Sequence, residues 1–207
     1  MRILITAGPT REFIDPVRYI SNSSTGYFGY RIAGEALRRG HKVVLVSGPV
    51  SLTPPEGAVF VPVVSALEME KAVKKYFYKA DCLIMSAAVA DYRPQRFIRS
   101  KIKKRSGTLS VRLRRNPDIL SWAGKNKGKR TVIGFALETE QLVRNALAKL
   151  EGKKADYIFA VLMRKGSSPF GGNKIKLKCL KKGKRPETVF STKEKLARFV
   201  LDNAENG

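Results

Sequence analysis

The 207-residue sequence contains a single histidine and only two cysteines, and this scarcity excludes several kinds of chemistry. His41 stands alone, without the spacing of a metal-ligand set or a catalytic triad, so we interpret it as structural. Cys82 and Cys179 lack a CxxC spacing, and Cys82 lies inside the apolar run CLIM. We therefore expect two buried free thiols, and we expect neither zinc chemistry nor histidine-dependent hydrolysis.

Long hydrophobic runs are also lacking. No apolar stretch reaches membrane-spanning length, and the N-terminus MRILITAGPT enters a strand pattern at once, without the apolar stretch and cleavage site of a signal peptide. These absences predict a cytoplasmic protein with no membrane partner. The length suits one core, so residues 1–207 are expected to form a single domain.

The common nucleotide-binding fingerprints are missing as well. A Walker loop needs Ser or Thr after Gly-Lys, and none of the Gly-Lys pairs is followed by either. The first strand runs into TAGPTRE rather than GxGxxG, and no Tyr-x-x-x-Lys pair is present, so nicotinamide redox chemistry loses its support. Lysine, arginine, asparagine and backbone amides on loops remain, and these groups suit phosphates and developing oxyanions.

Acidic residues are scarce, with 17 Asp and Glu against 41 Lys and Arg, which gives a net charge of +24. Such an excess attracts polyanions. It fits a solubilising surface, a site for several phosphates, or a basic nucleic-acid-binding module. Aromatics are sparse in the basic stretch 93–130, where Phe97 and Trp122 stand alone, so nucleic acid is the least favoured partner.

Short apolar runs alternate with amphipathic segments, a pattern typical of parallel strands joined by crossover helices. We therefore expect an α/β, Rossmann-like, mainly parallel sheet with flanking helices. The expected strands are 2–6, 42–46, 59–64, 81–86, 131–135 and 157–162, the expected helices are 27–39, 66–78, 138–150 and 193–202, and a hairpin of 175–180 with 188–190 closes the sheet.

Three local signals refine this expectation. Ser65 followed by Glu68 predicts a capping box at the start of the second helix. Leu109, Val111 and Leu113 alternate with polar residues, so 101–114 is predicted to be a half-exposed strand in a projecting β-hairpin that could be used for dimerisation. Asn116 before Pro117 predicts the N-cap and first residue of a short helix.

The loops after the first, fourth and fifth of these strands are expected to face one crevice, because ligands of such sheets bind beyond the carboxyl ends of the strands. In the first loop, Arg18 and Asn22 precede a Ser/Thr/Gly cluster that contains Ser24 and Gly26. A helix N-terminus at this cluster would bind an anion, although ordinary helix capping is an alternative.

The loop SAAVADYRP follows the fourth strand. Its small residues would let a flat ligand approach the backbone, and Asp91 offers a carboxylate to a hydroxyl group or a metal. The run KIKK at 101–104 follows shortly, and it is either a solvated face or part of a phosphate site.

Together these segments resemble a known family. DPVRYISNSSTGYFG, SAAVADYRP with KIKK, NPDIL, and IGFALET followed by Lys149, Lys153 and Asp156 are similar, in order and spacing, to phosphopantothenoylcysteine synthetase, also called phosphopantothenate cysteine ligase. The resemblance covers residues 3–156. It implies a step of coenzyme A biosynthesis in which a nucleoside triphosphate activates 4′-phosphopantothenate as an acyl nucleotidylate, with release of pyrophosphate, before the amine of cysteine attacks.

The resemblance also implies roles for particular residues. Asn22 would bind the activated acyl group and Arg18 the pantothenate end, with Ser24 and Gly26 on the same substrate side, while Lys101 would serve the attack by cysteine. The residues implied in nucleotide binding are Met85, Ser86, Ala87, Asp91, Lys101, Asn116, Pro117, Asp118, Ile119, Phe135, Lys149 and Lys153.

KIKK with NPDIL looks like the bacterial branch of the family, which implies CTP as co-substrate and Mg²⁺, whose ligands the sequence does not identify. The resemblance further implies a homodimer formed through the strands between KIKK and NPDIL. Met1 directly precedes the first strand, so we expect a stand-alone ligase or an excised domain, without flavin. A nucleotide-binding α/β protein that acts on another carboxylate is the alternative.

The sequence departs from the family pattern at two places. Ser23 and Thr25 stand where the family commonly has a basic residue and a serine. An asparagine usual after the sixth strand is absent from FAVLMRKGSSPFGG. Contacts on the pantothenate side are therefore where a different substrate preference would first appear.

Overall fold

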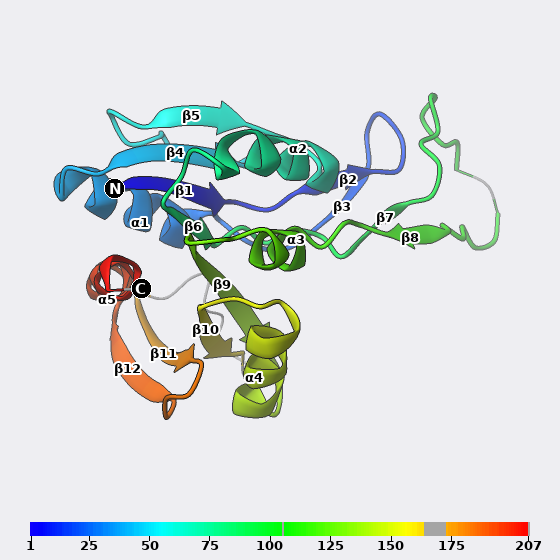
Figure 1. The fold of residues 1–207 in the computed structure, drawn as a ribbon. Coiled ribbons are helices and arrows are strands. Elements are labelled where there is room, and N and C mark those ends of the chain that lie inside the picture. Colours follow the sequence, from blue (N-terminus) through cyan, green and yellow to red (C-terminus); the bar gives the residue numbers. More distant parts are fainter. Residues whose placement is uncertain (105, 164–172, 207) are drawn as a thin grey trace.

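The protein, seen here as a computed structural model in which residues 1–104, 106–163 and 173–206 are described, is built on one eight-stranded sheet (Figure 1). The strand order is β12-β11-β10-β9-β6-β1-β4-β5. The strands of this sheet are β1 (Arg2–Ala7), β4 (Lys42–Ser47), β5 (Val59–Pro62), β6 (Cys82–Met85), β9 (Thr131–Glu138), β10 (Tyr157–Leu162), β11 (Lys174–Lys181) and β12 (Glu187–Thr192).

Six neighbouring strands of the sheet are mutually parallel, namely β10, β9, β6, β1, β4 and β5. β11 and β12 extend the sheet beyond β10 as an antiparallel hairpin. The runs ILITA in β1 and CLIM in β6 are buried throughout, because helices cover both faces of these central strands. This confirms the expected Rossmann-like architecture and the closing hairpin.

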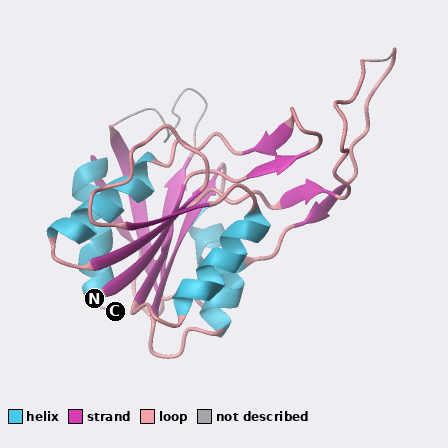
Figure 2. Ribbon diagram, turned by 90° about the horizontal axis from the view of Figure 1, so that it is seen from above, coloured by secondary structure: helices cyan, strands magenta, loops and turns pink. Residues whose placement is uncertain are grey.

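In the parts of the chain that the structure describes, five helices flank the sheet on its two faces (Figure 2). α1 (Tyr27–Arg38) and α5 (Lys193–Glu205) pack together and share one buried cluster with β1, β4 and β10. α2 (Ala66–Phe77), α3 (Ile119–Lys125) and α4 (Leu142–Gly152) bury their apolar faces in a second cluster on the opposite side. Helices therefore cover both faces of the sheet and leave the carboxyl ends of its strands accessible.

The strand order reverses beside β1. The chain leaves β1 through α1 and returns at β4 on one side, whereas β6 pairs with β1 on the other side. Such a switch point leaves a crevice beyond the carboxyl ends of the two strands, where open α/β sheets bind ligands. Gly29 brings α1 close to β1 at this point, because a Cβ atom there would stand 2.7 Å from Ala7 Cβ.

Two small two-stranded sheets project from this end of the molecule (Figures 1 and 2). β2 (Arg11–Phe13) pairs with β3 (Tyr19–Ser21), and β7 (Tyr92–Pro94) pairs with β8 (Leu113–Arg115). The prediction of a strand over 101–114 is wrong for most of its length. β7, the partner strand, has only three residues. The Gln95 amide donates to the Arg112 carbonyl at 2.9 Å, and beyond this hydrogen bond the described residues of the segment show no further strand pairing.

Helix starts differ from the expectation at two points. Asp118, rather than Asn116, caps α3, and its carboxylate accepts a hydrogen bond of 2.8 Å from the Ser121 amide. Asn116 instead accepts a hydrogen bond from the Arg93 guanidinium and donates one to the Ala90 carbonyl, both at 2.7 Å. The expected start of α4 at 138 is wrong because β9 continues to Glu138 and the helix begins at Leu142.

The cap of α2 is mostly as expected. The Ser65 hydroxyl accepts a hydrogen bond of 3.3 Å from the Glu68 amide, which confirms the predicted N-cap. The Glu68 carboxylate reaches the Val64 amide at 2.7 Å instead of the amide of the cap residue itself. A second carboxylate, that of buried Glu12, accepts a hydrogen bond of 2.9 Å from the Ala66 amide.

Both cysteines are buried and free, as expected. Burial raises the pKa of both thiols, that of Cys179 to about 11, so neither is a reactive thiolate at neutral pH. His41 ties the end of α5 to the start of β4 through Glu205, with 2.7 Å between Nε2 and the carboxylate. It has the structural role that its isolation in the sequence indicated.

Among the described residues, no helix combines the length and apolar character that crossing a bilayer requires. The segment 164–172, which contains part of the stretch where the family's asparagine is absent, lies outside the described residues.

We expect Glu35 to make the stability of the fold depend on pH. Hydrogen bonds from Arg38, at 2.8 and 2.7 Å, are the largest cause that lowers the pKa of this carboxyl from 4.5 to about 2, and Arg39 adds a bond of 3.1 Å. Because the folded-state pKa is depressed, the contribution is complete above pH ~5 and is lost as the pH falls toward 2. Urea denaturation should show that the free energy of unfolding falls between about pH 5 and pH 2, and that this fall is smaller in Glu35→Gln by on the order of 1 kcal/mol.

The exposed Glu56 provides the matched control, since Glu56→Gln should leave the fall in the free energy of unfolding unchanged. Equal pH dependence in wild type and Glu35→Gln would contradict the assignment of this effect to Glu35.

Candidate functional site

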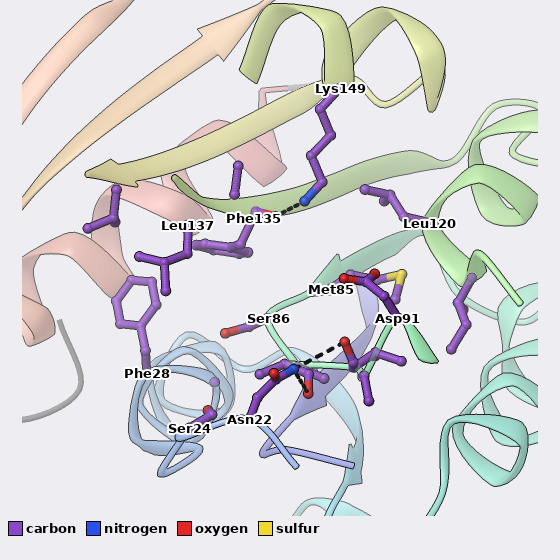
Figure 3. Close-up of a pocket in the computed structure, with 18 of the residues that line it drawn as sticks. Asn22, Ser24, Phe28, Met85, Ser86, Asp91, Leu120, Phe135, Leu137 and Lys149 are labelled. Atoms are coloured by element: carbon purple, nitrogen blue, oxygen red, sulfur yellow. Dashed lines mark hydrogen bonds between the residues drawn. The ribbon is translucent and has the colours of Figure 1, made fainter. Parts of the chain in front are cut away.

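Hydrogen bonds join the loop after β1 to the loop after β6. The Ala88 amide donates to the Gly8 carbonyl at 2.9 Å, and the Thr10 amide donates to the Ala88 carbonyl at 3.3 Å. The side-chain amide of Asn22 donates to the carbonyls of Ala88 and Val89, at 3.1 and 3.3 Å (Figure 3). These bonds hold Asn22 at the switch point between β1 and β6.

A cavity of about 1310 Å³ opens at this place (Figure 3). Its walls come from the loop and helix start 22–29, the loop 85–92, residues 115–120 before and in α3, the end of β9 and the last turn of α4. Pockets that bind one small ligand usually have volumes of about 300–1,000 Å³. This cavity is larger than that range.

Most of the sequence-predicted site residues meet in this cavity. Those that line it are Asn22, Ser24, Gly26, Met85, Ser86, Ala87, Asp91, Asn116, Pro117, Asp118, Ile119, Phe135, Lys149 and Lys153. Arg18 and Lys101 do not line it. The three loops expected to share one crevice do so.

The N-terminus of α1 forms one wall of the cavity. Gly26 precedes the helix with a φ of 75°, and α1 has neither a side-chain cap from the described residues nor an acidic residue in its first turn. The Ser24 hydroxyl accepts a hydrogen bond of 3.3 Å from the Gly26 amide, so this serine shapes the loop instead of capping the helix. The positive end of the helix dipole thus faces the cavity, where it favours an anion.

Two lysines and a carboxylate line the α3–α4 side. Lys149 donates to the Phe135 carbonyl at 2.9 Å, and burial lowers the pKa of its ammonium group, with the Glu138 charge opposing that shift. Lys153 pairs with the Asp118 carboxylate. Burial raises the pKa of Asp118, but the hydrogen bonds from Lys153 and the Ser121 amide outweigh burial and lower it. Both lysines are positioned to meet an anionic ligand.

An apolar surface lies between the helix terminus and the lysines. The Phe135 ring packs edge-on against Phe28, with 5.6 Å between ring centroids, and lies tilted by 31° against Phe159 at 5.5 Å. Leu137 lines the cavity beside Phe28 and Phe135 (Figure 3). This surface suits the apolar part of a ligand, such as a ribose face or an alkyl chain.

Arg18 and Lys101 belong to a second structure beside the cavity. Buried Asp15 accepts hydrogen bonds from the Val17 and Arg18 amides, at 2.8 Å each, and from the Ile102 amide at 3.1 Å. The Arg18 guanidinium donates to the Ile102 carbonyl at 2.7 Å. The turn between β2 and β3 therefore anchors the segment that carries Lys101.

Sequence analysis missed three contributors to this region. Asp15 is the anchor of the Lys101 segment, Phe28 forms the apolar wall, and Lys193 lines the cavity from α5. Phe28 could have been found from its place in the first turn of the helix after the Ser/Thr/Gly cluster. Asp15 makes a local turn with the Val17 and Arg18 amides, but its contact with Ile102 has no local signal, and neither has the place of Lys193 in the cavity.

No group of three or more His, Cys, Asp or Glu side chains that could hold a metal ion occurs in the described parts of the chain. Asp91, which is exposed and lines the cavity, is a carboxylate available to a cation there. Mg²⁺ usually binds through one or two carboxylates together with substrate phosphates and water. Asp91 is thus the carboxylate that could contact a Mg²⁺ ion held mainly by the phosphates of a ligand.

Gly124 allows α3 to approach the end of α4 closely enough for Asp118 to meet Lys153. A Cβ atom at Gly124 would stand 1.9 Å from the Lys153 carbonyl oxygen, so we expect Gly124→Ala to lower the free energy of unfolding by about 1–3 kcal/mol. Gly34, in the middle of α1, has nothing within 4 Å of the corresponding position.

Gly34→Ala is therefore the matched control and should raise stability by roughly 0.5–1 kcal/mol through helix propensity. Urea denaturation measures both effects, and equal stabilisation by the two substitutions would disprove the close contact at Gly124.

Comparisons with known proteins support this architecture. Residues 1–206 match the family model of the DNA/pantothenate metabolism flavoprotein C-terminal domain. The chain is 43% identical over 172 residues to the Coenzyme A biosynthesis bifunctional protein CoaBC of Bacillus subtilis, in an alignment that covers 83% of this chain and 42% of that protein.

Two solved structures share the fold over nearly the whole chain. The C-terminal domain of a Coenzyme A biosynthesis bifunctional protein CoaBC is 38% identical, with a TM-score of 0.84, and the match covers 99% of this chain and 93% of that one. The DNA/pantothenate metabolism flavoprotein from Streptococcus pneumoniae is 25% identical, with a TM-score of 0.87 and coverage of 100% and 99%. The chain spans about half the length of the bifunctional relatives it matches.

Proposed function

Because the chain belongs to the family of DNA/pantothenate metabolism flavoprotein C-terminal domains, we propose that it is the ligase that joins 4′-phosphopantothenate to cysteine in coenzyme A biosynthesis. The family membership agrees with the resemblance found in the sequence motifs. The bifunctional relatives are about twice as long as this chain, and the proposal concerns only this one reaction.

The observation that carries this proposal is the composition of the cavity. A helix N-terminus without a side-chain cap from the described residues and the lysines of α4 line opposite parts of a single large cavity. Both substrates of the first half-reaction are anionic, since one is a nucleoside triphosphate and the other a phosphorylated carboxylic acid. Hydrogen-bond donors and cations without an enzyme nucleophile are what such a reaction needs.

In the first half-reaction, a carboxylate oxygen of 4′-phosphopantothenate attacks the α-phosphorus of the nucleotide. The bond from that phosphorus to the β-phosphate bridging oxygen breaks, and pyrophosphate leaves. Lys149 and Lys153 stabilise the negative charge on the phosphates, and the α1 N-terminus offers a second anion site. Phe135 presents an apolar ring to the nucleoside.

In the second half-reaction, the amine of cysteine attacks the acyl carbon, the bond from this carbon to the nucleotide oxygen breaks, and the nucleoside monophosphate and one proton leave. Asn22 orients the acyl group at the switch point. Its two amide hydrogens are held by Ala88 and Val89, so an acyl oxygen would have to exchange with one of these carbonyls, while Oδ1 can accept from the incoming amine. Lys101 assists this step, which requires its segment to close over the cavity.

The finer features of the proposal rest on the family resemblance together with the site. The nucleotide is CTP, Mg²⁺ neutralises its phosphates with Asp91 as the nearby carboxylate, and no flavin takes part. The protein works in the cytoplasm as a homodimer. The exposed Leu109, Val111 and Leu113 on the projecting segment provide an apolar surface for the second subunit.

A pyrophosphate-release assay tests the proposal. Folded protein should release pyrophosphate when 4′-phosphopantothenate, cysteine, Mg²⁺ and CTP are all present, and faster with CTP than with ATP. Absence of release with either nucleotide would refute the ligase. Release with another carboxylic acid, but not with 4′-phosphopantothenate, would identify a nucleotide-dependent enzyme with a different acyl substrate.

A further inference from the structure

Lys193 is a lysine in the wall of the cavity, and most of its side chain is buried. It is the first residue of α5, is only 4% exposed, and lies beside the first turn of α1, with Nζ 5.5 Å from the centroid of the Tyr27 ring. α5 packs along α1 on the face of the sheet away from α3 and α4 (Figure 1). Lys193 therefore enters the cavity from the side opposite Lys149 and Lys153.

Within the described residues, no carboxylate lies within 4 Å of the Lys193 ammonium group. The adjacent Glu194 is directed elsewhere, because its carboxylate accepts a hydrogen bond of 2.8 Å from the Tyr27 hydroxyl and lies 3.8 Å from Arg31. The segment 164–172 contains no Asp or Glu in its sequence. Lys193 thus differs from Lys153, which is paired with Asp118.

Burial lowers the pKa of Lys193, and the charge of Glu194 opposes that shift only in part. A lysine side chain that lines a cavity and has no carboxylate partner among the described residues can meet an anion there. An anionic ligand in the cavity would supply the missing partner. The N-terminus of α1, whose first residue is Tyr27, has no side-chain cap from the described residues and favours an anion at the same end of the cavity.

We propose that Lys193 binds a phosphate group of a substrate at the α1–α5 end of the cavity. This inference deepens the proposed function and rests on it. A phosphate is the anion that an ammonium point charge and a helix N-terminus bind together. In the ligase reaction this group is either the triphosphate end of the nucleotide or the phosphate of 4′-phosphopantothenate.

Calorimetric titration of Lys193→Met with four ligands distinguishes the two sources. If Lys193 binds the nucleotide, affinity for CTP should fall at least ten-fold and affinity for CMP less than two-fold. If it binds the other substrate, the same contrast should appear between 4′-phosphopantothenate and pantothenate. Lys193→Arg should restore part of the loss, because it keeps the charge.

Lys195→Met is the matched control, since Lys195 lies on the same helix but is exposed. It should leave all four affinities unchanged. Thermal unfolding without ligand adds a second measurement. Lys193→Met should keep or raise the unfolding temperature, because the charge that it removes has no carboxylate partner among the described residues.

Two results would overturn the inference while leaving the ligase in place. One is unchanged affinities in Lys193→Met, and the other is equal losses for CTP and CMP together with equal losses for 4′-phosphopantothenate and pantothenate. A lowered unfolding temperature without a selective loss would show a structural role instead. Wild-type protein that binds none of the four ligands would overturn the proposed function, and this inference with it.

Discussion

Replacement of Asn22 by aspartate is expected to reduce turnover by about 10²–10³-fold while the protein stays folded. Asn22 is exposed and donates both amide hydrogens to the carbonyls of Ala88 and Val89. A carboxylate has no hydrogens to donate, so it would face these two carbonyl oxygens with like charge and would repel an anionic acyl substrate. Loss of two hydrogen bonds at an exposed position should cost stability only about 1–2 kcal/mol.

Steady-state kinetics with saturating CTP and cysteine measure this effect, and circular dichroism checks the fold. The matched control is Asn126→Asp, because the Asn126 amide also donates to a backbone carbonyl, that of Trp122 at 2.8 Å, but outside the cavity. This control should retain nearly full turnover. An Asn22→Asp enzyme with wild-type turnover would remove Asn22 from the proposed site.

Lys101→Gln is expected to separate the two half-reactions. The first half-reaction should proceed, because the cavity lining that surrounds the nucleotide does not include Lys101. The attack by cysteine should slow by about 10²-fold or more, since a cation near the developing negative charge is lost. Acyl nucleotidylate should therefore accumulate in the presence of cysteine.

Rapid quenching followed by mass spectrometry measures the intermediate and the final amide separately. Lys103→Gln, two residues away on the same exposed segment, is the control and should not accumulate the intermediate. Equal loss of both half-reactions in Lys101→Gln would contradict the division of labour between the cavity and the projecting segment.

The sequence was a good guide to the sheet and to the position of the cavity. Strands such as CLIM are apolar throughout because both of their faces are covered, and this signal is local. The rule that loops at the carboxyl edge share a crevice then brings together Asn22, Asp91 and Asp118. Most candidate site residues follow from these two steps.

The short elements could not be predicted in the same way. β2, β3, β7 and β8 have three residues each, too few for an alternating pattern to stand out. Their pairing is stabilised by contacts such as those of Asp15 with Ile102, 87 residues apart. The alternation at Leu109, Val111 and Leu113 indicated a strand, but a strand also needs a partner, and β7 ends too soon to provide one.

The fate of Arg18 and Lys193 shows the same limitation. Arg18 is four residues from Asn22, yet β3 separates the two and the Arg18 guanidinium turns toward Ile102. Lys193 was expected only as the beginning of a helix. It reaches the cavity because α5 packs on α1, a contact between segments more than 150 residues apart.

The acyl side of the cavity is where this chain departs from its family pattern. Ser23 and Thr25 lie in the loop before α1 and both line the cavity. The Thr25 hydroxyl accepts a hydrogen bond of 3.4 Å from the Tyr27 amide, as the Ser24 hydroxyl does from Gly26. The departures therefore change the side chains that a substrate would meet, and Thr25 takes up the first amide of α1 while Gly26 offers no side-chain cap.

The central claim is that this cavity activates a carboxylate at the α-phosphorus of a nucleotide. The most direct test supplies 4′-phosphopantothenate labelled with ¹⁸O in its carboxylate, together with CTP, Mg²⁺ and cysteine, and weighs the products. The proposed mechanism transfers one ¹⁸O to CMP, because the bond between the acyl carbon and this oxygen breaks in the second step. Label in inorganic phosphate, with CDP as the second product, would contradict it.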